Sequence, residues 1–335
     1  MLRLLVLLLA GAPGVLVAAQ QLGGAGPWWL ELSRYLPYPL LLLPSIVALV
    51  LALRLPMRWL AAPVAALALT ASVGMGLAWH PAKPGDGAVR VMTYNAKVMN
   101  AMARPGGVEA LAREVARHHP DVVVMQDAGR LMHGRVSGVG PPLFGLPEIY
   151  GAGQYVFASR LPLHDCTSGQ ADTRGEPFHY ARCSVGVGPA AFVLVTAHFE
   201  SPRTGLNAAR HEGVDGIESW RRNQADRLAQ SRGLAQALAG NTGALVLAGD
   251  LNAPESSEVV GNLLGIGLRD AFSTAGRGYG YTYGHTLRPA VSFLRIDHIL
   301  VGPAIGVVDC FAGGDDASDH RPVIADLLPG RPGSD

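Results

Sequence analysis

The first 80 residues are almost continuously apolar, and three long stretches within them have the pattern of membrane-spanning helices. These stretches cover residues 4–19, 36–53 and 59–79. The second and third contain no acidic or basic side chain, and each is long enough to cross a hydrocarbon core of about 30 Å. Only residues 54–58 separate them. The sequence therefore predicts an antiparallel hairpin of two spanning helices.

The first stretch fits two interpretations. Arg3, a run of leucines and the closing Ala18 are typical of a cleaved signal peptide. Gly11 and Pro13 are also tolerated in a spanning helix. We expect an uncleaved span, with cleavage as the alternative, so the predicted membrane region at residues 1–80 has two or three transmembrane helices.

From residue 89 onwards, strand patterns alternate with helical ones. Apolar runs of β-type composition predict strands at residues 89–94, 121–125, 155–159, 183–187, 191–196, 244–248, 295–301 and 323–327. Apolar residues at helical spacing predict helices at residues 107–119, 221–238 and 256–264. Residues 129–152 and 200–219 are predicted to be irregular. Several strands are apolar on both faces, which requires covering layers on both sides and favours an α/β sandwich.

The same pattern divides the chain into four parts. Residues 81–88 contain two prolines and two glycines and are predicted to form a linker after the membrane region. Residues 89–328 form the predicted soluble domain, and residues 329–335 a flexible tail. No sequence feature indicates a protein partner.

The distribution of charged residues disfavours two classes of function, tight binding of duplex nucleic acid and transport across a membrane. Positions 1–87 hold 5 of the 27 basic and 2 of the 26 acidic residues, so the soluble part has a formal charge of −2. A protein that grips many duplex phosphates usually has a basic excess. A transporter or channel is disfavoured as well, since the three apolar stretches carry no charge to mark a pathway.

Basic residues beside the spans predict the orientation in the membrane. Arg54 and Arg58 lie in the second connection and Arg3 lies at the N-terminus, whereas Glu31 offsets Arg34 in the first connection. The sequence therefore predicts a multi-pass protein of the cell (inner) membrane, with its C-terminal domain on the extracytoplasmic (periplasmic) side.

Six short polar motifs occur among the predicted strands of the soluble domain. They are Tyr94-Asn95, Gln126-Asp127, Thr196-Ala197-His198, Gly249-Asp250-Leu251-Asn252, Ile296-Asp297-His298 and Ser318-Asp319-His320. Polar groups at the ends of buried strands are costly unless they are paired or hold a metal. The motifs therefore predict one shared site, suited to metal-assisted attack of water on a phosphate ester.

In their order, these motifs resemble the endonuclease/exonuclease/phosphatase superfamily over residues 89–328. The resemblance implies an α/β fold, a four-layer α/β/β/α sandwich, here preceded by N-terminal transmembrane helices. It also implies hydrolysis of phosphate esters with a divalent metal, Mg²⁺ with Mn²⁺ as the alternative.

The resemblance implies metal ligation by two carboxylates. Asp127 stands where the family has glutamate, and a carboxylate there suits a hard cation. Asp319 is the second predicted ligand or an electrostatic neighbour. Asn95 matches an asparagine that hydrogen-bonds the catalytic centre, and Lys97 offers a cation for phosphate where abasic-site endonucleases have an acidic residue.

The remaining motif residues have implied catalytic roles. Asp250 orients or deprotonates the attacking water, and Asn252 contacts a phosphate oxygen. His320 accepts a proton or binds phosphate, with Asp297 fixing its tautomer. His198 stabilises the developing charge or protonates the leaving oxygen.

The substrate stays open between two classes, a nucleic acid outside the cytoplasm and a lipid head group at the bilayer. A non-catalytic binding module with the same fold is the less favoured alternative. Cys166 follows one predicted strand and Cys183 lies in the next, so the sequence allows either a disulfide between neighbouring strands or two unpaired thiols.

Overall fold

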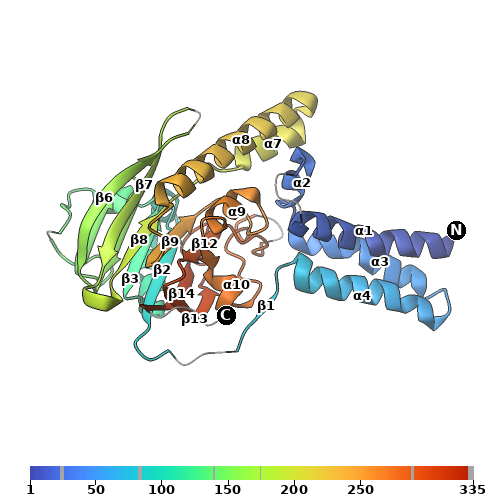
Figure 1. Ribbon diagram of the computed structural model, residues 1–335. Coiled ribbons are helices and arrows are strands. Elements are labelled where there is room, and N and C mark those ends of the chain that lie inside the picture. The colour runs from blue at the N-terminus through green and yellow to red at the C-terminus, as the bar shows by residue number, and fades with distance from the viewer. Residues whose placement is uncertain (23–25, 82–84, 139, 174, 288–289, 331–335) are drawn as a thin grey trace.

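The computed structural model describes the chain except residues 23–25, 82–84, 139, 174, 288–289 and 331–335. Two sheets of six strands each form the centre of the domain that follows the N-terminal apolar region (Figure 1). The first sheet has the spatial order β10 (Arg269–Asp270), β12 (Asp297–Val301), β9 (Leu245–Asp250), β8 (Phe192–Thr196), β7 (Phe178–Val185) and β6 (Leu163–Ala171). The second has the order β13 (Ile305–Ala312), β14 (Val323–Pro329), β2 (Val89–Asn95), β3 (Val122–Gln126), β5 (Tyr155–Ser159) and β4 (Glu148–Ala152).

Helices cover the outer face of each sheet. On the second sheet lie α5 (Val98–Met102) and α6 (Gly107–His118), whose apolar residues pack with Met92 and Val123. On the first sheet lie α8 (Gly213–Leu238) and α9 (Glu258–Leu264), which pack with Val195 and Leu247. The inner faces of both sheets share one further core, which includes Val91. The predicted α/β/β/α sandwich is thus confirmed.

The short elements complete the domain. They are α7 (Arg203–His211), α10 (Ala271–Ala275), η4 (Gly129–Met132), η5 (Gly188–Ala190) and a two-stranded sheet of β1 (Ala78–Trp79) with β11 (Arg277–Gly278). Six strands were not predicted, namely the two-residue strands β1, β10 and β11 and the longer strands β4, β6 and β13. Each is an edge strand, and β6 is largely exposed on both faces, so it lacks the apolar run that marks a buried strand. Residues 200–219 contain α7 and the start of α8, where an irregular segment was predicted. Gly205 lets α7 approach Trp220 there, because an added Cβ would lie 3.2 Å from the indole.

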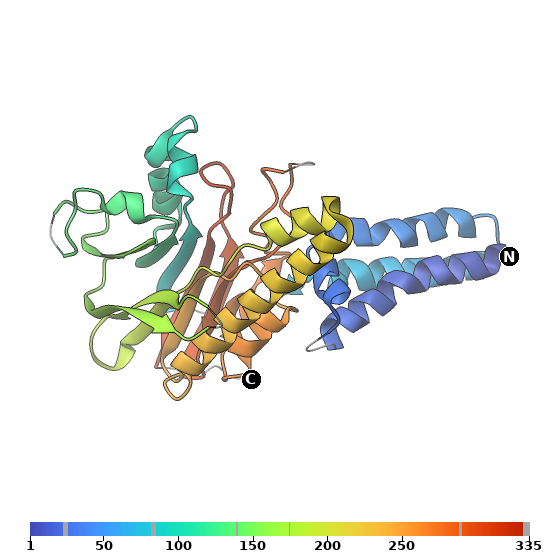
Figure 2. The same cartoon turned by 90° about the horizontal axis from the view of Figure 1, so that it is seen from above.

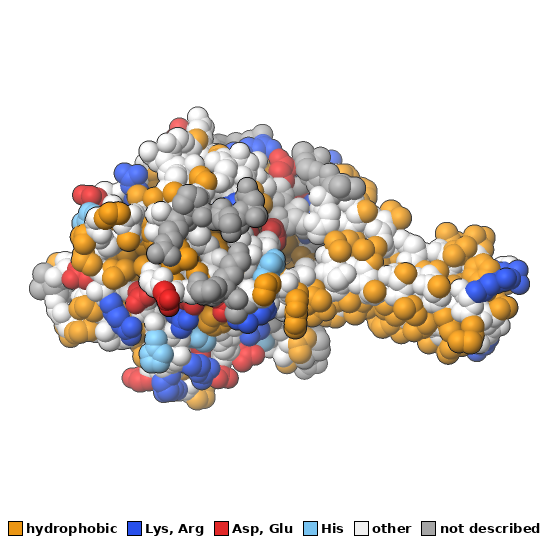
Figure 3. Space-filling model, turned by 60° about the horizontal axis from the view of Figure 1, so that its bottom comes forward, with side chains coloured by type: hydrophobic (Ala, Val, Ile, Leu, Met, Phe, Trp, Pro, Cys, Tyr) orange, Lys and Arg blue, Asp and Glu red, His pale blue; other side chains and the backbone are white. Residues whose placement is uncertain are grey.

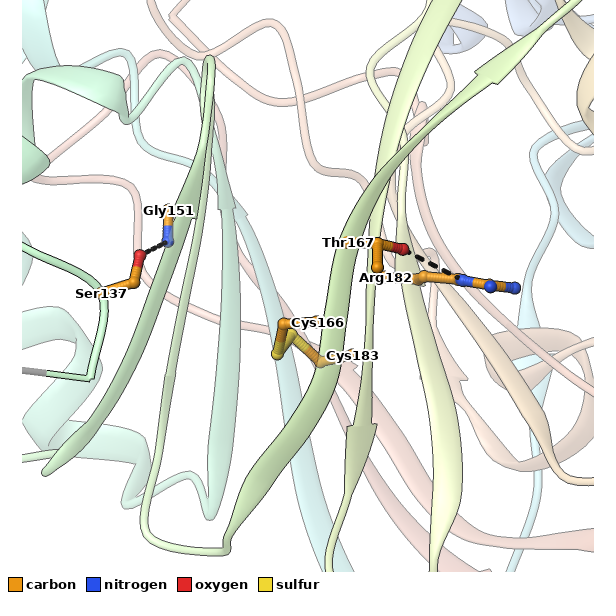
Figure 4. The surroundings of a disulfide bond; sticks show 6 residues. All are labelled: Ser137, Gly151, Cys166, Thr167, Arg182 and Cys183. Carbon is orange, nitrogen blue, oxygen red and sulfur yellow. Dashed lines mark hydrogen bonds between the residues drawn. A yellow bond between two sulfur atoms is a disulfide. The ribbon is translucent and has the colours of Figure 1, made fainter.

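A disulfide joins Cys166 to Cys183 across β6 and β7 (Figure 4). The sequence had left this pairing open. The two cysteines are 17 residues apart. In the chain-entropy picture, closing a loop of that length stabilises the fold by about 3 kcal/mol. The bond ties the exposed edge strand to the buried one.

The N-terminal helices form a bundle that projects from one end of the sandwich (Figure 2). Its elements are α1 (Leu2–Leu22), α2 (Trp28–Ser33), η1 (Tyr38–Leu42), α3 (Leu43–Ala52), η2 (Met57–Leu60), α4 (Ala61–Leu69) and the π-helical turn η3 (Thr70–Gly74). By length and composition alone, residues 2–21 and 57–74 are sufficient to cross a membrane, and residues 38–52 form a shorter apolar helix. The third stretch leaves the bundle after Gly74, since Trp79 pairs with Arg277 in the small sheet.

Apolar side chains cover most of the face of this bundle that Figure 3 shows. Leu4, Val15 and Val50 are more than half exposed. Such a continuous apolar surface is unusual for a soluble protein and is typical of an element that contacts lipid or another protein.

Candidate active site

The strand ends that carry the polar motifs meet at one edge of the sandwich. Asn95 lies opposite Gln126 at the ends of the parallel strands β2 and β3. In the other sheet, Asp250 lies opposite Asp297 in the β9–β12 ladder, and His198 forms a bridge with Asp250. Residues far apart in the sequence therefore share one site.

Three of these residues form its buried centre. Asp250, Asp297 and His320 each offer an atom that lies within 4.8 Å of the others, and all three side chains are buried. His320 Nδ1 lies 2.9 Å from Asp297 Oδ2, and Nε2 lies 3.7 Å from Asp250 Oδ2. Asp297 thus fixes the imidazole so that Nε2 faces Asp250.

The charges of this centre shift one another's pKa. Burial acts to lower the pKa of His320, but Asp297 and Asp250 outweigh it and the pKa is raised. Burial and the neighbouring Asp297 raise the pKa of Asp250, against the opposing effects of His320, His198 and Asn95. His320 and Asp250 therefore keep their protons to a higher pH than isolated side chains would.

Backbone geometry holds Asp250 in place. Its Oδ2 accepts a hydrogen bond of 2.8 Å from Asn95 Nδ2, and its Oδ1 accepts one of 2.9 Å from the backbone N–H of Asn252. Asn252 has a φ of 49°, in the left-handed region that asparagine tolerates better than most residues. Its side-chain amide donates to the backbone oxygen of Phe199 at 2.8 Å. Hydrogen bonds thus connect the end of β9 and the turn after it to Asn95 in the second sheet and to Phe199, which follows β8 in the first sheet.

His198 lies beside this turn. Its Nδ1 is 2.7 Å from Gln154 Oε1, and its Nε2 is 3.5 Å from Asp250 Oδ2. An imidazole that donates from Nδ1 to the amide oxygen presents Nε2 to the site. Gln154 was not predicted, because it lies in the β4–β5 turn and belongs to no recognisable motif.

The two predicted metal ligands flank the centre in ion pairs. Lys97 Nζ donates to Asp127 Oδ2 at 2.6 Å, and His198 Nδ1 lies 3.6 Å from Asp127 Oδ1. Burial acts to raise the pKa of Asp127, but His198 and Lys97 outweigh it and the pKa is lowered. Asp127 is therefore a carboxylate at neutral pH.

Asp319 has its own partners. Its Oδ2 accepts a hydrogen bond of 2.9 Å from Asn100, and its Oδ1 pairs with Arg104. Burial opposes these contacts, yet the pKa of Asp319 is lowered. The structure thus places all eight predicted site residues at this edge, with Asp127 and Asp319 outside the tight carboxylate–imidazole group.

Two buried oxygens make the site suitable for a divalent cation. Asn95 Oδ1 and Asp297 Oδ1 have no hydrogen-bond partner within the described part of the chain. Buried polar atoms are normally satisfied by protein, water or an ion. Carboxylate and amide oxygens are also the donors that Mg²⁺ and Mn²⁺ prefer. The residues present therefore fit the predicted metal.

Arg203 and Tyr283 border the site, and sequence reasoning missed the arginine. The Tyr283 ring lies 5.0 Å from the His320 ring, and its hydroxyl accepts a hydrogen bond from Arg203. Arg203 begins α7, in the segment predicted to be irregular. It brings an exposed positive charge to the rim.

Comparisons with known proteins agree with this geometry. The model of the Endonuclease/Exonuclease/phosphatase family matches residues 92–320. No curated protein sequence matches the chain. Among solved structures, an endonuclease/exonuclease/phosphatase from Bacteroides vulgatus is similar, with a TM-score of 0.53 and 18% identity over 72% of this chain and 99% of that one.

Two further solved structures share the fold. An endonuclease/exonuclease/phosphatase from Beutenbergia cavernae is 21% identical over 72% of each chain, with a TM-score of 0.51. TDP2 from D. rerio, complexed with a single-strand DNA product, is 17% identical over 72% of this chain and 99% of that one, with a TM-score of 0.52. At these identities the likeness is one of fold.

Proposed function

Since the chain belongs to the endonuclease/exonuclease/phosphatase family, whose members are hydrolases of phosphoester bonds, we propose that it is a membrane-tethered, divalent-metal-dependent phosphoesterase. The observation that carries this proposal is the buried group of Asp250, Asp297 and His320 at one end of the sandwich. It combines the proton-transfer groups and the oxygen donors that attack of water on phosphorus needs.

In the proposed reaction, Asp250 and His320 orient a water molecule and take its proton as it attacks phosphorus. Asp297 keeps the His320 ring oriented through the Nδ1 hydrogen bond. His198 protonates the leaving oxygen, and Asn252 contacts a phosphate oxygen. Asp127, Asp319 and the free oxygen of Asn95 would hold the cation. When bound, Mg²⁺ or Mn²⁺ supplies positive charge that stabilises the phosphate oxygens.

Two substrate classes follow from different observations. The apolar bundle favours a lipid head group, because a site tethered to the bilayer meets such a substrate at high effective concentration. The family favours a nucleic acid, although the formal charge of the soluble part is near neutral. Hydrolysis of single-stranded DNA, duplex DNA, sphingomyelin and inositol phosphates by the full chain would distinguish them.

Metal removal tests the proposal. We expect EDTA to lower the hydrolysis rate of the best substrate in that panel by about 100-fold or more, since charge stabilisation at a phosphate contributes several kcal/mol. Excess Mg²⁺ or Mn²⁺ should restore the rate, whereas excess Ca²⁺ should restore less of it, because Ca²⁺ demands more ligands and a looser geometry. Hydrolysis that persists at full rate in EDTA would contradict metal dependence. Calorimetric Mg²⁺ binding without hydrolysis would favour the binding-module alternative.

We also propose that the sandwich lies on the extracytoplasmic side of the inner membrane, with residues 1–80 as its multi-pass anchor, residues 81–88 as the linker, residues 89–328 as the catalytic domain and residues 329–335 as the tail. The apolar bundle supports the anchor, and the disulfide fits an oxidising compartment.

Thiol trapping tests this location, with the cells quenched in acid and the protein denatured before alkylation, because Cys183 is buried in the fold. We expect Cys166 and Cys183 to resist alkylation before reduction and to react after it, because they are oxidised outside the cytoplasm. The Cys166→Ala variant is the control, since it frees Cys183 for alkylation without reduction. Complete alkylation of the unreduced wild type would place the domain in the cytoplasm and contradict the proposed orientation.

A further inference from the structure

The segment between the first two apolar helices packs against the proposed catalytic domain. Trp28 accepts a hydrogen bond of 3.1 Å at its backbone oxygen from Trp220 Nε1 in α8. Glu31 accepts one of 2.6 Å from Ser257 Oγ, in the connection that follows β9. The helical bundle is therefore joined to the domain by polar contacts as well as by the chain itself.

One residue of this segment reaches the turn that carries the motif of β9. The hydroxyl of Tyr35 donates a hydrogen bond of 3.0 Å to the backbone oxygen of Asn252, and its ring packs edge-on against Trp220 at 5.6 Å. The side chain is buried. The membrane-proximal segment thus contacts the residue two positions after Asp250.

Arg227 supports this contact from α8. Its Nη1 donates to the Tyr35 hydroxyl and lies 3.4 Å from the Asn252 backbone oxygen. The guanidinium is fully buried and lies over the Tyr35 and Trp220 rings. Within the described ranges no carboxylate forms an ion pair with it, so the Tyr35 hydroxyl, the Asn252 carbonyl, the Asn223 side-chain oxygen at 3.1 Å from Nε and the two rings stabilise its charge. The Tyr35 hydroxyl contacts both the Arg227 guanidinium and the Asn252 carbonyl.

The backbone of Asn252 helps to orient Asp250. The N–H of Asn252 donates to Asp250 Oδ1, and the residue has a φ of 49°, in the left-handed region that asparagine tolerates better than most residues. We propose that Tyr35 is a positioning residue of the active site, which holds the Asn252 carbonyl and, through the backbone of that residue, the N–H that donates to the Asp250 carboxylate. The N-terminal anchor then contributes to the geometry of the active site in addition to tethering the domain. The catalytic consequence rests on the proposed function, whereas the ordering of the turn does not.

A pair of tyrosine variants in the full chain, purified in detergent micelles, tests this inference. Tyr35→Phe removes one hydroxyl at the junction. Its control, Tyr281→Phe, also removes one buried hydroxyl there, since Tyr281 donates to the Met75 backbone oxygen at 2.9 Å without touching the Asn252 turn. The readouts are kcat and KM on the best panel substrate, the thermal midpoint, and amide hydrogen exchange of peptides covering residues 249–256.

Tyr35→Phe is expected to lower kcat by about tenfold with little change in KM, because small misplacement of a reacting group carries a large rate penalty. It should speed exchange in residues 249–256 by about tenfold. Tyr281→Phe should change neither, although both variants lower the thermal midpoint by similar amounts.

Unchanged exchange in Tyr35→Phe would overturn the inference. Equal changes in both variants would overturn it too, since they would report general loosening of the junction. If the wild type hydrolyses no substrate in the panel, the proposed function fails, and the exchange data still decide whether Tyr35 orders the turn.

Discussion

Asp250→Asn is expected to lower kcat by about 10²–10³-fold while leaving the protein folded. The asparagine keeps the shape of the side chain but removes the charge that orients the attacking water and faces His320 and His198. Loss of one such preorganised group typically raises the barrier by about 3–4 kcal/mol. The measurement is steady-state hydrolysis with saturating Mg²⁺.

The thermal stability of Asp250→Asn should change much less than its activity. The raised pKa of Asp250 means that its ionised form destabilises the fold. The contribution of this one group to stability is greatest below its unfolded pKa and is lost as the pH rises through its folded pKa. A neutral asparagine removes that cost near pH 7 and gives up one hydrogen-bond acceptor. We therefore expect the thermal midpoint to stay within a few degrees of wild type.

A surface carboxylate provides the matched control for that measurement. Asp309→Asn removes the ion pair with Arg277 at the edge of the sandwich, and exposed pairs contribute little. Its kcat should equal that of the wild type. Full activity of Asp250→Asn, or equal losses in both variants, would remove Asp250 from the mechanism.

The sequence predicted the site because its residues end apolar strands. Once the runs before Asn95, Asp127, His198 and Asp250 are assigned to buried strands, parallel pairing of β2 with β3 and of β8 with β9 brings their ends to one edge. The order of the motifs then indicated the family. Strands that are apolar on both faces favoured an α/β sandwich, and the family resemblance implied its four layers.

What the sequence did not predict depends on contacts between distant exposed or irregular segments. Gln154 orients His198 from a turn, and Arg203 reaches Tyr283 from α7. Neither position has a periodicity or motif of its own. Tyr35 lies in a short connection between apolar helices, where nothing local indicates that its hydroxyl contacts the Asn252 turn.

His298 shows a further limit of motif reading. It directly follows Asp297 and belongs to the same motif, yet adjacent residues of a strand face opposite sides of the sheet. Asp297 points to His320, whereas His298 Nδ1 lies 2.7 Å from Asp270 Oδ2 and Nε2 lies 2.9 Å from the Ala253 backbone oxygen. One half of the motif therefore belongs to the site and the other half to a structural network behind it.

That structural network gives the largest expected effect on stability. Asp270 is buried, pairs with Arg295 at 2.7 Å and contacts His298. It also caps α10 by accepting hydrogen bonds from the backbone N–H groups of Phe272 and Ser273. Asp270→Ala should lower the free energy of unfolding by about 3–5 kcal/mol, because it leaves Arg295 without its buried partner and α10 without its cap. Urea unfolding in detergent, followed by tryptophan fluorescence, measures the loss.

The pH dependence separates the charge of Asp270 from its cap. Burial opposes ionisation, but Arg295 and His298 outweigh it and hold the pKa of Asp270 well below its usual range. For an acid whose folded pKa is lowered, the stabilisation is complete above the unfolded pKa of about 3.9 and is lost as the pH falls below it.

Asp270→Asn keeps a good helix cap and lacks the titrating charge. Its stability should therefore lie between that of Asp270→Ala and wild type at pH 7 and approach wild type as the pH falls below about 4. A constant gap between Asp270→Asn and wild type across that range would show that the ion pair contributes no net stability and that the cap and packing carry the whole effect.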